Sequence, residues 1–176
     1  IADNIKEVVP TMMSAVPRVF EKFYDKIYDS GKKLSGVSKK IYYWAIEVAM
    51  QYPLEKEDRT NLWYNLKYAI AKKLVLEKIT AAVGGDFDIL VSGSASIPPR
   101  LMSFFSAISM PAFEGYGLTE TSPVIAVASR KRHAREAKTI GFPLDGVEVK
   151  IADNGEIICK GPSIMLGYYK APELTA

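Results

Sequence analysis

The sequence has little of what several protein classes require. It has one cysteine, Cys159, so no disulfide can form within the chain, and we expect a reducing compartment, the cytoplasm. It has one histidine, His133, which alone offers neither a set of metal ligands nor a catalytic triad. No run approaches the roughly 20 apolar residues that span a bilayer. The first residues also lack the basic start and apolar run of a signal peptide.

Net charge is modest as well. The 176 residues carry a formal charge of +3, with 48% hydrophobic and 24% charged residues, as in ordinary globular proteins. This balance, without a basic stripe interleaved with aromatics, disfavours a nucleic-acid partner. The basic run from Arg130 to Arg135 could contact phosphate groups or anionic lipid, but a solvated loop is the simpler interpretation. Likewise, core packing is the simpler interpretation of the aromatic segment Tyr42–Tyr52, and a membrane belt is the alternative.

Residues 1–83 are predicted to be mainly helical. After Pro17, apolar residues recur at spacings of three and four, and Gly31 closes this amphipathic helix. A second helix is predicted over Ser38–Tyr52 and a third over Asp58–Thr80. The third helix carries four apolar residues at i, i+4 spacing: Leu62, Leu66, Ile70 and Leu74.

Residues 84–128 change to an α/β pattern. Phe87–Val91 is predicted to be a short buried strand, and residues 97–108 a helix with proline in its first turn. Residues 111–116 and Val124–Ala128 are further strand candidates. A strand, a helix and a strand in about 30 residues predict a βαβ unit with a right-handed crossover.

Residues 139–176 are predicted to be rich in β-structure. Two alternating runs flank Asn154-Gly155, a dipeptide that strongly predicts a hairpin. Cys159, on the second run, is expected to be a small core residue. No linker composition separates the three parts. The predicted fold class is therefore α/β: a helical first half, a βαβ-type sheet segment and a β-hairpin within one domain.

Two polar loops leave the ends of predicted strands, Ser92–Ser96 and Gly115–Glu120. Ligands of parallel sheets bind beyond the carboxyl ends of the strands. If these two strands are neighbours, both loops therefore face one pocket.

The second loop has residues suited to a nucleotide. The ring of Tyr116 could lie against a purine, and the hydroxyl of Thr119 could bond a phosphate oxygen. Glu120 could give Mg²⁺ a carboxylate oxygen. Gly115 and Gly117 would allow close backbone approach. A glycine turn with a core tyrosine and a helix cap is the alternative.

The segment YGLTETSP, Tyr116–Pro123, resembles the signature of the adenylate-forming enzymes, which include acyl-CoA synthetases, luciferases and peptide-synthetase adenylation domains. Val16–Ile27 resembles a segment typical of the long-chain fatty acyl-CoA synthetase branch. Further similar segments follow in the family's order, so that the resemblance covers nearly the whole chain: LVSGSASIPPRL (90–101), IGFPLDGVEVKI (140–151) and GEIICKGPSIMLGYYKAPELT (155–175).

The resemblance implies an enzyme, an AMP-forming long-chain-fatty-acid–CoA ligase with the large-domain fold of its family. With ATP and Mg²⁺ it would convert a fatty acid to an acyl-adenylate and transfer the acyl group to CoA. A medium-chain or aryl-acid ligase, or a non-catalytic relative that binds nucleotide or membrane, is the alternative. A peripheral position on the inner face of a membrane and the oligomeric state stay open.

Matched residue by residue, the resemblance implies that Tyr116 stacks on adenine. Thr119 would hold the α-phosphate and Glu120 would bind Mg²⁺, which makes these two the catalytic residues. Four small residues would shape the nucleotide and acyl pocket through their backbone: Ser94, Ala95, Gly115 and Gly117.

The chain departs from the family pattern in two ways. Ser94 and Ser96 replace the second Gly and the Pro of the loop Ser-Gly-Gly-Ala-Pro, so the resemblance does not fix the backbone course there. No segment matches the family's phosphate loop ending in Pro-Lys-Gly, its Thr-Gly-Asp, or the C-terminal subdomain with its catalytic lysine. We therefore expect residues 1–176 to be an internal piece of the N-terminal AMP-binding domain, inactive alone.

Overall fold

The computed structural model describes residues 10–54, 61–84, 87–128 and 139–175, together with Ile5, Glu7 and Val8. The basic run from Arg130 to Arg135, with His133, lies outside the described residues. The described elements follow in chain order: β1 (Met12–Ala15), α2 (Pro17–Ser30), η1 (Gly31–Lys33), α3 (Gly36–Met50), α4 (Leu62–Ala71), the π-helical turn η3 (Lys72–Leu76), α5 (Glu77–Val83), β2 (Ile89–Ser92), α6 (Pro99–Ala107), β3 (Ala112–Tyr116), η4 (Thr119–Thr121), β4 (Ala126–Val127), β5 (Phe142–Pro143), β6 (Glu148–Ile151), β7 (Ile157–Lys160) and α7 (Pro172–Thr175).

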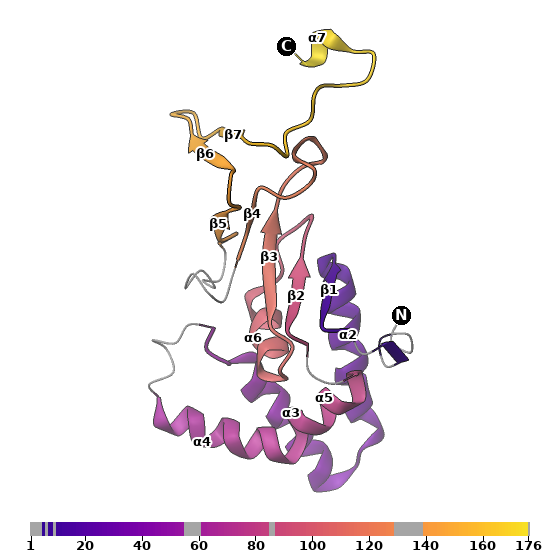
Figure 1. Cartoon of the computed structure of the whole chain (residues 1–176). Helices are drawn as coiled ribbons and strands as arrows, with labels where there is room; N and C mark the ends of the chain where they lie inside the picture. The colour runs from indigo at the N-terminus through magenta and orange to yellow at the C-terminus, as the bar shows by residue number, and fades with distance from the viewer. Residues whose placement is uncertain are drawn as a thin grey trace.

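The central sheet is mixed, with the strand order β1-β2-β3-β4-β5. The first three strands run parallel, and β4 and β5 add to them antiparallel. The chain passes from β2 through α6 to β3, and this confirms the predicted βαβ arrangement of parallel neighbours (Figure 1). The α/β fold class is therefore correct. Strand β1 was not predicted, because a strand of four residues gives too short a pattern to be recognised.

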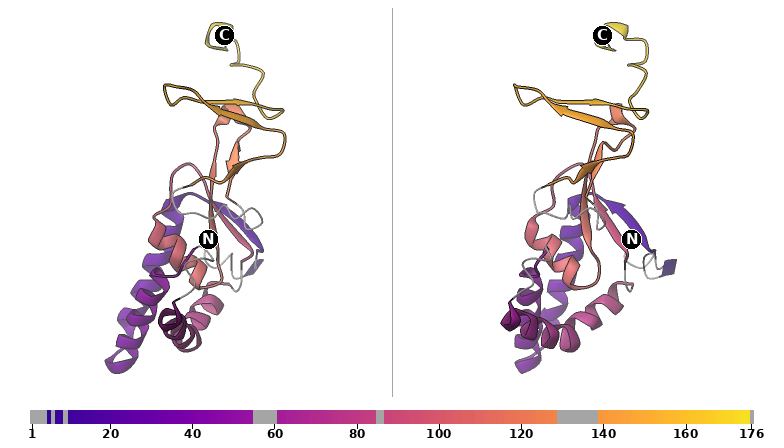
Figure 2. Two further views of the ribbon diagram at one scale, coloured as in Figure 1. Left: turned by 90° about the vertical axis from the view of Figure 1, so that its left-hand side faces the viewer. Right: turned by 60° about the vertical axis from the view of Figure 1, so that its left-hand side comes forward.

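Helices α2 and α6 cover one face of the sheet (Figure 2). Their contact is made by aromatic rings. Phe20 meets Phe105 edge to face with ring centres 5.6 Å apart, and Tyr24 meets Phe104 at 5.1 Å. Such T-shaped pairs add roughly 0.5–1.5 kcal/mol beyond the apolar area that they bury. The predicted helix after Pro17 thus forms because its apolar face has a partner in α6.

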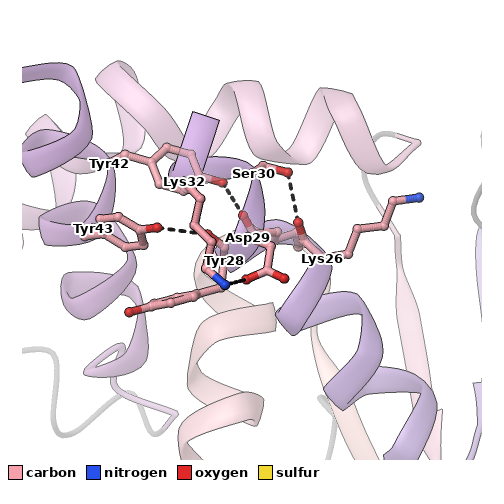
Figure 3. A network of polar contacts seen from close by, with 8 residues as sticks. Lys26, Tyr28, Asp29, Ser30, Lys32, Tyr42 and Tyr43 are labelled. Carbon is pink, nitrogen blue, oxygen red and sulfur yellow. Dashed lines mark hydrogen bonds and ion pairs between the residues drawn. The ribbon is translucent and has the colours of Figure 1, made fainter. Parts of the chain in front are cut away.

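Helices α2 and α3 are joined by tyrosine hydroxyls at their shared end (Figure 3). The Tyr42 hydroxyl donates to the carbonyl of Ile27 at 2.7 Å, and the Tyr43 hydroxyl donates to that of Tyr28 at 3.4 Å. The aromatic segment after residue 41 therefore packs against the core, as the simpler interpretation of the sequence held.

The apolar stripe of α4 and η3 faces outward. Leu62, Leu66, Ile70 and Leu74 are between 45% and 84% exposed. The opposite side of this helix packs on the core, where Ala71, Val75 and Leu76 are buried. The predicted helix is thus confirmed from Leu62 onward and continues to Val83, while its first residues, Asp58–Thr60, lie outside the described residues. The regular stripe is not the face that the described residues bury.

The β6–β7 hairpin extends away from the core and carries α7 beyond it (Figure 1). The hairpin turns at Asn154-Gly155 as predicted, and Gly155 has a φ of +86°. The main core cluster contains none of the described residues beyond 128. Cys159 is a half-buried free cysteine, so the expectation of a core residue there is wrong. Its neighbours along β7 are exposed because no second layer of described residues covers the hairpin.

Candidate functional site

The two polar loops leave adjacent parallel strands at the same end. Ser92, the last residue of β2, is in register with Glu114 of β3. The loop after Ser92 and the loop after Tyr116 consequently begin side by side at the carboxyl edge of the sheet (Figure 1). This confirms that the two strands are neighbours, the condition on which the predicted convergence of the loops depends.

A buried carboxylate ties the two loops together. Glu114 is 4% exposed, and its Oε1 accepts a hydrogen bond from the Ser96 hydroxyl at 2.6 Å and from the Ile97 amide at 2.7 Å. Hydrogen bonds to an ionised acceptor are worth about 1.5–3 kcal/mol each. Sequence reasoning gave Glu114 no role. The available signal was a lone acidic residue at the end of a buried strand, which needs donors to be tolerated there.

The first loop places its two predicted residues at the surface. Ser94 and Ala95 are both exposed, and Ser94 has a φ of +69°. This left-handed conformation suits glycine far better than other residues. It occurs at the position where the resembling family has its second glycine. Ser94 therefore holds, at a cost in strain, a backbone conformation that glycine adopts readily.

The second loop begins with Gly115, Tyr116 and Gly117, all half-buried. The carbonyl of Tyr116 accepts a hydrogen bond from the Ile125 amide at 2.8 Å, which folds the chain back over the loop. A Cβ at Gly117 would lie 1.7 Å from the carbonyl oxygen of Pro123. No side chain fits there, so this glycine is required by the fold-back alone.

Thr119 and Glu120 lie on a short 3-10 turn, η4. Thr121 closes this turn: its hydroxyl oxygen accepts from the Leu118 amide at 2.9 Å and lies within hydrogen-bond distance of the Leu118 and Pro123 carbonyls. Thr119 is exposed and Glu120 half-exposed. The turn thus presents a hydroxyl and a carboxylate on adjacent residues beyond the end of β3.

Glu120 receives a hydrogen bond from a distant part of the chain. The Tyr168 hydroxyl donates to its Oε1 at 2.7 Å. This bond and the residue's own backbone N–H lower the pKa of Glu120, while the same carboxylate raises the pKa of Tyr168. Glu120 therefore stays ionised at neutral pH, as a metal ligand must.

The donor set suits a metal that is shared with a bound nucleotide. The described residues hold no cluster of three or more histidine, cysteine or acidic side chains that could bind a metal by themselves. Mg²⁺ commonly takes one or two carboxylates and completes its shell with phosphate oxygens and waters. Glu120 provides one such carboxylate, so the residues present fit Mg²⁺ bound together with phosphate.

An apolar cavity of about 660 Å³ lies elsewhere, between α2, α3, η3 and α5. Its lining includes Phe105 and Met110, near the amino end of β3, and no residue of the two polar loops. The candidate site is at the carboxyl end of that strand. This cavity therefore does not belong to the site formed by the loops.

Comparison with known proteins gives the family. The model of the AMP-binding family, described as "AMP-binding enzyme", matches residues 1–169. The chain belongs to the AMP-binding enzyme family. Its curated relatives include the putative fatty-acid–CoA ligase fadD11 of Mycobacterium tuberculosis, 35% identical over 181 aligned positions that cover 100% of this chain and 31% of that protein. The long-chain-fatty-acid–CoA ligase FadD15 of Mycobacterium bovis is 33% identical over 94% of this chain and 27% of its own length.

The fold is also found in solved structures. The O-succinylbenzoate coenzyme A synthetase of Bacillus subtilis, determined with ATP and magnesium, matches 98% of this chain and 27% of its own with a TM-score of 0.55 at 18% identity. At that identity the likeness concerns the fold alone. The chain spans about 30% of the length of the curated relatives. Within the part of the chain that the structure describes, no helix is long and apolar enough to cross a membrane.

Proposed function

We propose that this chain is the nucleotide-binding part of an AMP-forming long-chain-fatty-acid–CoA ligase. We use the name intact ligase for the protein that has the full length of the relatives. One observation carries the proposal: the Ser94–Ala95 loop and the Thr119–Glu120 turn follow two adjacent parallel strands at the same edge of the sheet. Fatty-acid–CoA ligases among the relatives support this substrate class. We infer that residues 84–128 carry the adenylate-binding loops, flanked by the helical 1–83 and the β-rich 139–176.

The reaction joins a carboxylate to a thiol in two steps. The fatty-acid carboxylate attacks the α-phosphorus of ATP, an acyl-adenylate forms and pyrophosphate leaves. The CoA thiol then attacks the activated carbonyl, a thioester forms and AMP leaves. Bound Mg²⁺ would neutralise charge on the phosphate oxygens during the first step.

Each predicted site residue has a role in this proposal. Tyr116 would give the adenine a ring face. Thr119 would donate its exposed hydroxyl to the α-phosphate, and Glu120 would hold Mg²⁺. Two positions would line the nucleotide and acyl pocket through their backbone, Ser94 and Ala95. Gly115 and Gly117 are half-buried and, having no side chain, would let the backbone approach the same pocket closely.

The partners of the intact ligase would be a fatty acid, ATP and CoA. We place it in the cytoplasm, where the free Cys159 would stay reduced. Contact with the inner face of a membrane would give it direct access to poorly soluble acyl chains. A medium-chain or aryl-acid ligase would use the same nucleotide site, and acids of increasing chain length distinguish these substrates.

The test is ATP–pyrophosphate exchange by the intact ligase with acids of increasing chain length. We expect exchange that depends on a long-chain acid and falls by about 100-fold or more in Glu120→Gln, since ligand loss removes charge stabilisation at the reacting phosphate. Glu156→Gln in the hairpin turn is the matched control and should keep the wild-type rate. An absence of exchange with every acid would contradict the proposal and favour a non-catalytic nucleotide-binding relative.

A further inference from the structure

Tyr168 and Glu120 are 48 residues apart in sequence and in direct contact in the fold. The O–H···O distance of 2.7 Å is normal for a hydroxyl donor, and a bond to an ionised acceptor is roughly twice as strong as a neutral one. The residue's own backbone N–H also bonds this carboxylate. The phenol thus fixes Oε1, and the two carboxylate oxygens together keep further lone pairs for a cation.

A backbone contact joins the same two segments. The amide of Met165 donates to the carbonyl oxygen of Glu120 at 2.8 Å. The turn that carries Glu120 and the segment that carries Tyr168 are thus bonded at main chain and at side chain. Two hydrogen bonds fix the relative position of the two segments. A single exposed hydrogen bond would not do so.

Tyr168 is itself held by the helix that follows it. Its backbone N–H donates to Oγ1 of Thr175 in α7 at 2.9 Å, and the Thr175 hydroxyl donates to the carbonyl of Ala171. Gly167 makes this close approach possible. It has a φ of +150°, and a Cβ there would lie 2.6 Å from the Thr175 methyl group. These contacts constrain the backbone on both sides of Tyr168, in the conformation in which its phenol bonds Glu120.

We propose that Tyr168 is a positioning residue that orients the Glu120 carboxylate for Mg²⁺, an inference that rests on the proposed function. A free glutamate on a surface turn samples several rotamers, and binding a metal must then select one of them. The hydrogen bond from Tyr168 makes that selection in advance. Partners of this kind, which bond a metal ligand without touching the metal, typically contribute 10–100-fold in metal affinity or activity.

The test compares Tyr168→Phe with Tyr169→Phe in the intact ligase. Tyr169 is a matched control because it is 88% exposed and its ring lies under the Lys170 ammonium, whose nitrogen is 5.3 Å from the ring centre. In Tyr168→Phe we expect the Mg²⁺ concentration for half-maximal ATP–pyrophosphate exchange to rise about tenfold, while the rate at saturating Mg²⁺ stays within about twofold. Tyr169→Phe should match the wild type in both quantities.

A second readout does not depend on turnover. The dissociation constant of Mn²⁺ from the complex of the ligase with a non-hydrolysable ATP analogue, followed by electron paramagnetic resonance, should also rise about tenfold in Tyr168→Phe. The urea unfolding midpoint should not change. A variant that loses stability or maximal rate while it keeps wild-type metal affinity would show a structural role and overturn the inference.

Glu120→Gln separates this inference from the proposed function. If Glu120→Gln loses metal affinity and Tyr168→Phe behaves like Tyr169→Phe, the positioning role is wrong and the ligase proposal stands. If Glu120→Gln keeps wild-type Mn²⁺ binding, Glu120 is not the metal ligand and the positioning role is overturned, whereas the ligase proposal is overturned only if no acid supports exchange.

Discussion

At the scale of the residue, Gly115 and Gly117 flank the same tyrosine and differ in what a side chain would meet. A Cβ at Gly115 would lie 3.5 Å from the Val91 side chain, an ordinary contact. At Gly117 it would overlap the Pro123 carbonyl oxygen, and that backbone atom cannot move without opening the fold-back. Close approach of the backbone to itself therefore accounts for Gly117 independently of any nucleotide.

This difference predicts unequal effects of one substitution. Gly117→Ala should lower the free energy of unfolding by about 3 kcal/mol or more, because the new methyl group forces the backbone apart. Gly115→Ala should change it by no more than about 1 kcal/mol. Urea denaturation of the two variants measures both values. Equal losses would mean that the fold-back at Pro123 does not confine Gly117.

Ser94 and Glu114 show how single residues support the loops. Ser94 holds a left-handed conformation that its side chain disfavours, and the loop that contains it is tied to β3 through the bonds of Ser96 and Ile97 to Glu114. Strain of about 1–2 kcal/mol at one residue is tolerable when neighbouring bonds to a carboxylate hold the loop in place.

At the scale of the element, hydroxyls of half-buried tyrosines join successive helices. Tyr42 on α3 bonds the carbonyl of Ile27 on α2, and Tyr64 on α4 bonds that of Val48 on α3 at 3.0 Å. Burial raises the pKa of both phenols above the usual value of about 10, and neighbouring tyrosines add to the effect. An ionised phenolate could not donate these bonds.

The stability of these helix contacts should therefore depend on alkaline pH. The folded chain holds the Tyr64 proton more tightly than the unfolded chain, so its contribution is complete below about pH 10 and is lost as pH rises toward the folded-state pKa. Tyr64→Phe should cost about 1 kcal/mol at pH 8 and make the loss of stability between pH 9 and 11 less steep. Urea denaturation at a series of pH values measures this, and an unchanged slope would show that Tyr64 ionises alike in both states.

At the scale of the whole molecule, the candidate site combines parts that are far apart in sequence. β2 and β3 supply the two loops, and the extension beyond the hairpin supplies Tyr168. The same arrangement leaves apolar side chains of α4 outside, among them Leu62 and Leu66. The chain spans about 30% of its relatives' length. We therefore do not interpret the exposed apolar side chains of α4 as the final surface of the intact ligase.

We predict that the purified 176-residue chain forms no acyl-CoA from fatty acid, ATP and CoA. It has the turn that we propose binds the α-phosphate and metal, but no segment like the phosphate loop ending in Pro-Lys-Gly. Positioned cationic and hydrogen-bond donors supply most of the stabilisation in phosphoryl chemistry, so their loss removes the reaction. A thioester assay by mass spectrometry checks this, and turnover above the rate without protein would contradict it.

The sequence by itself determined the family, the α/β class and the loop residues of the candidate site, because these depend on local patterns. The motif at Tyr116, the hairpin dipeptide and the helical periodicities each act within a few residues of chain. The tertiary structure alone decided four features: the pairing of β1, the bond from Ser96 to Glu114, the outward stripe of α4 and the contact of Tyr168 with Glu120. Each depends on which distant segment lies alongside, and the local pattern of a segment does not specify its partner.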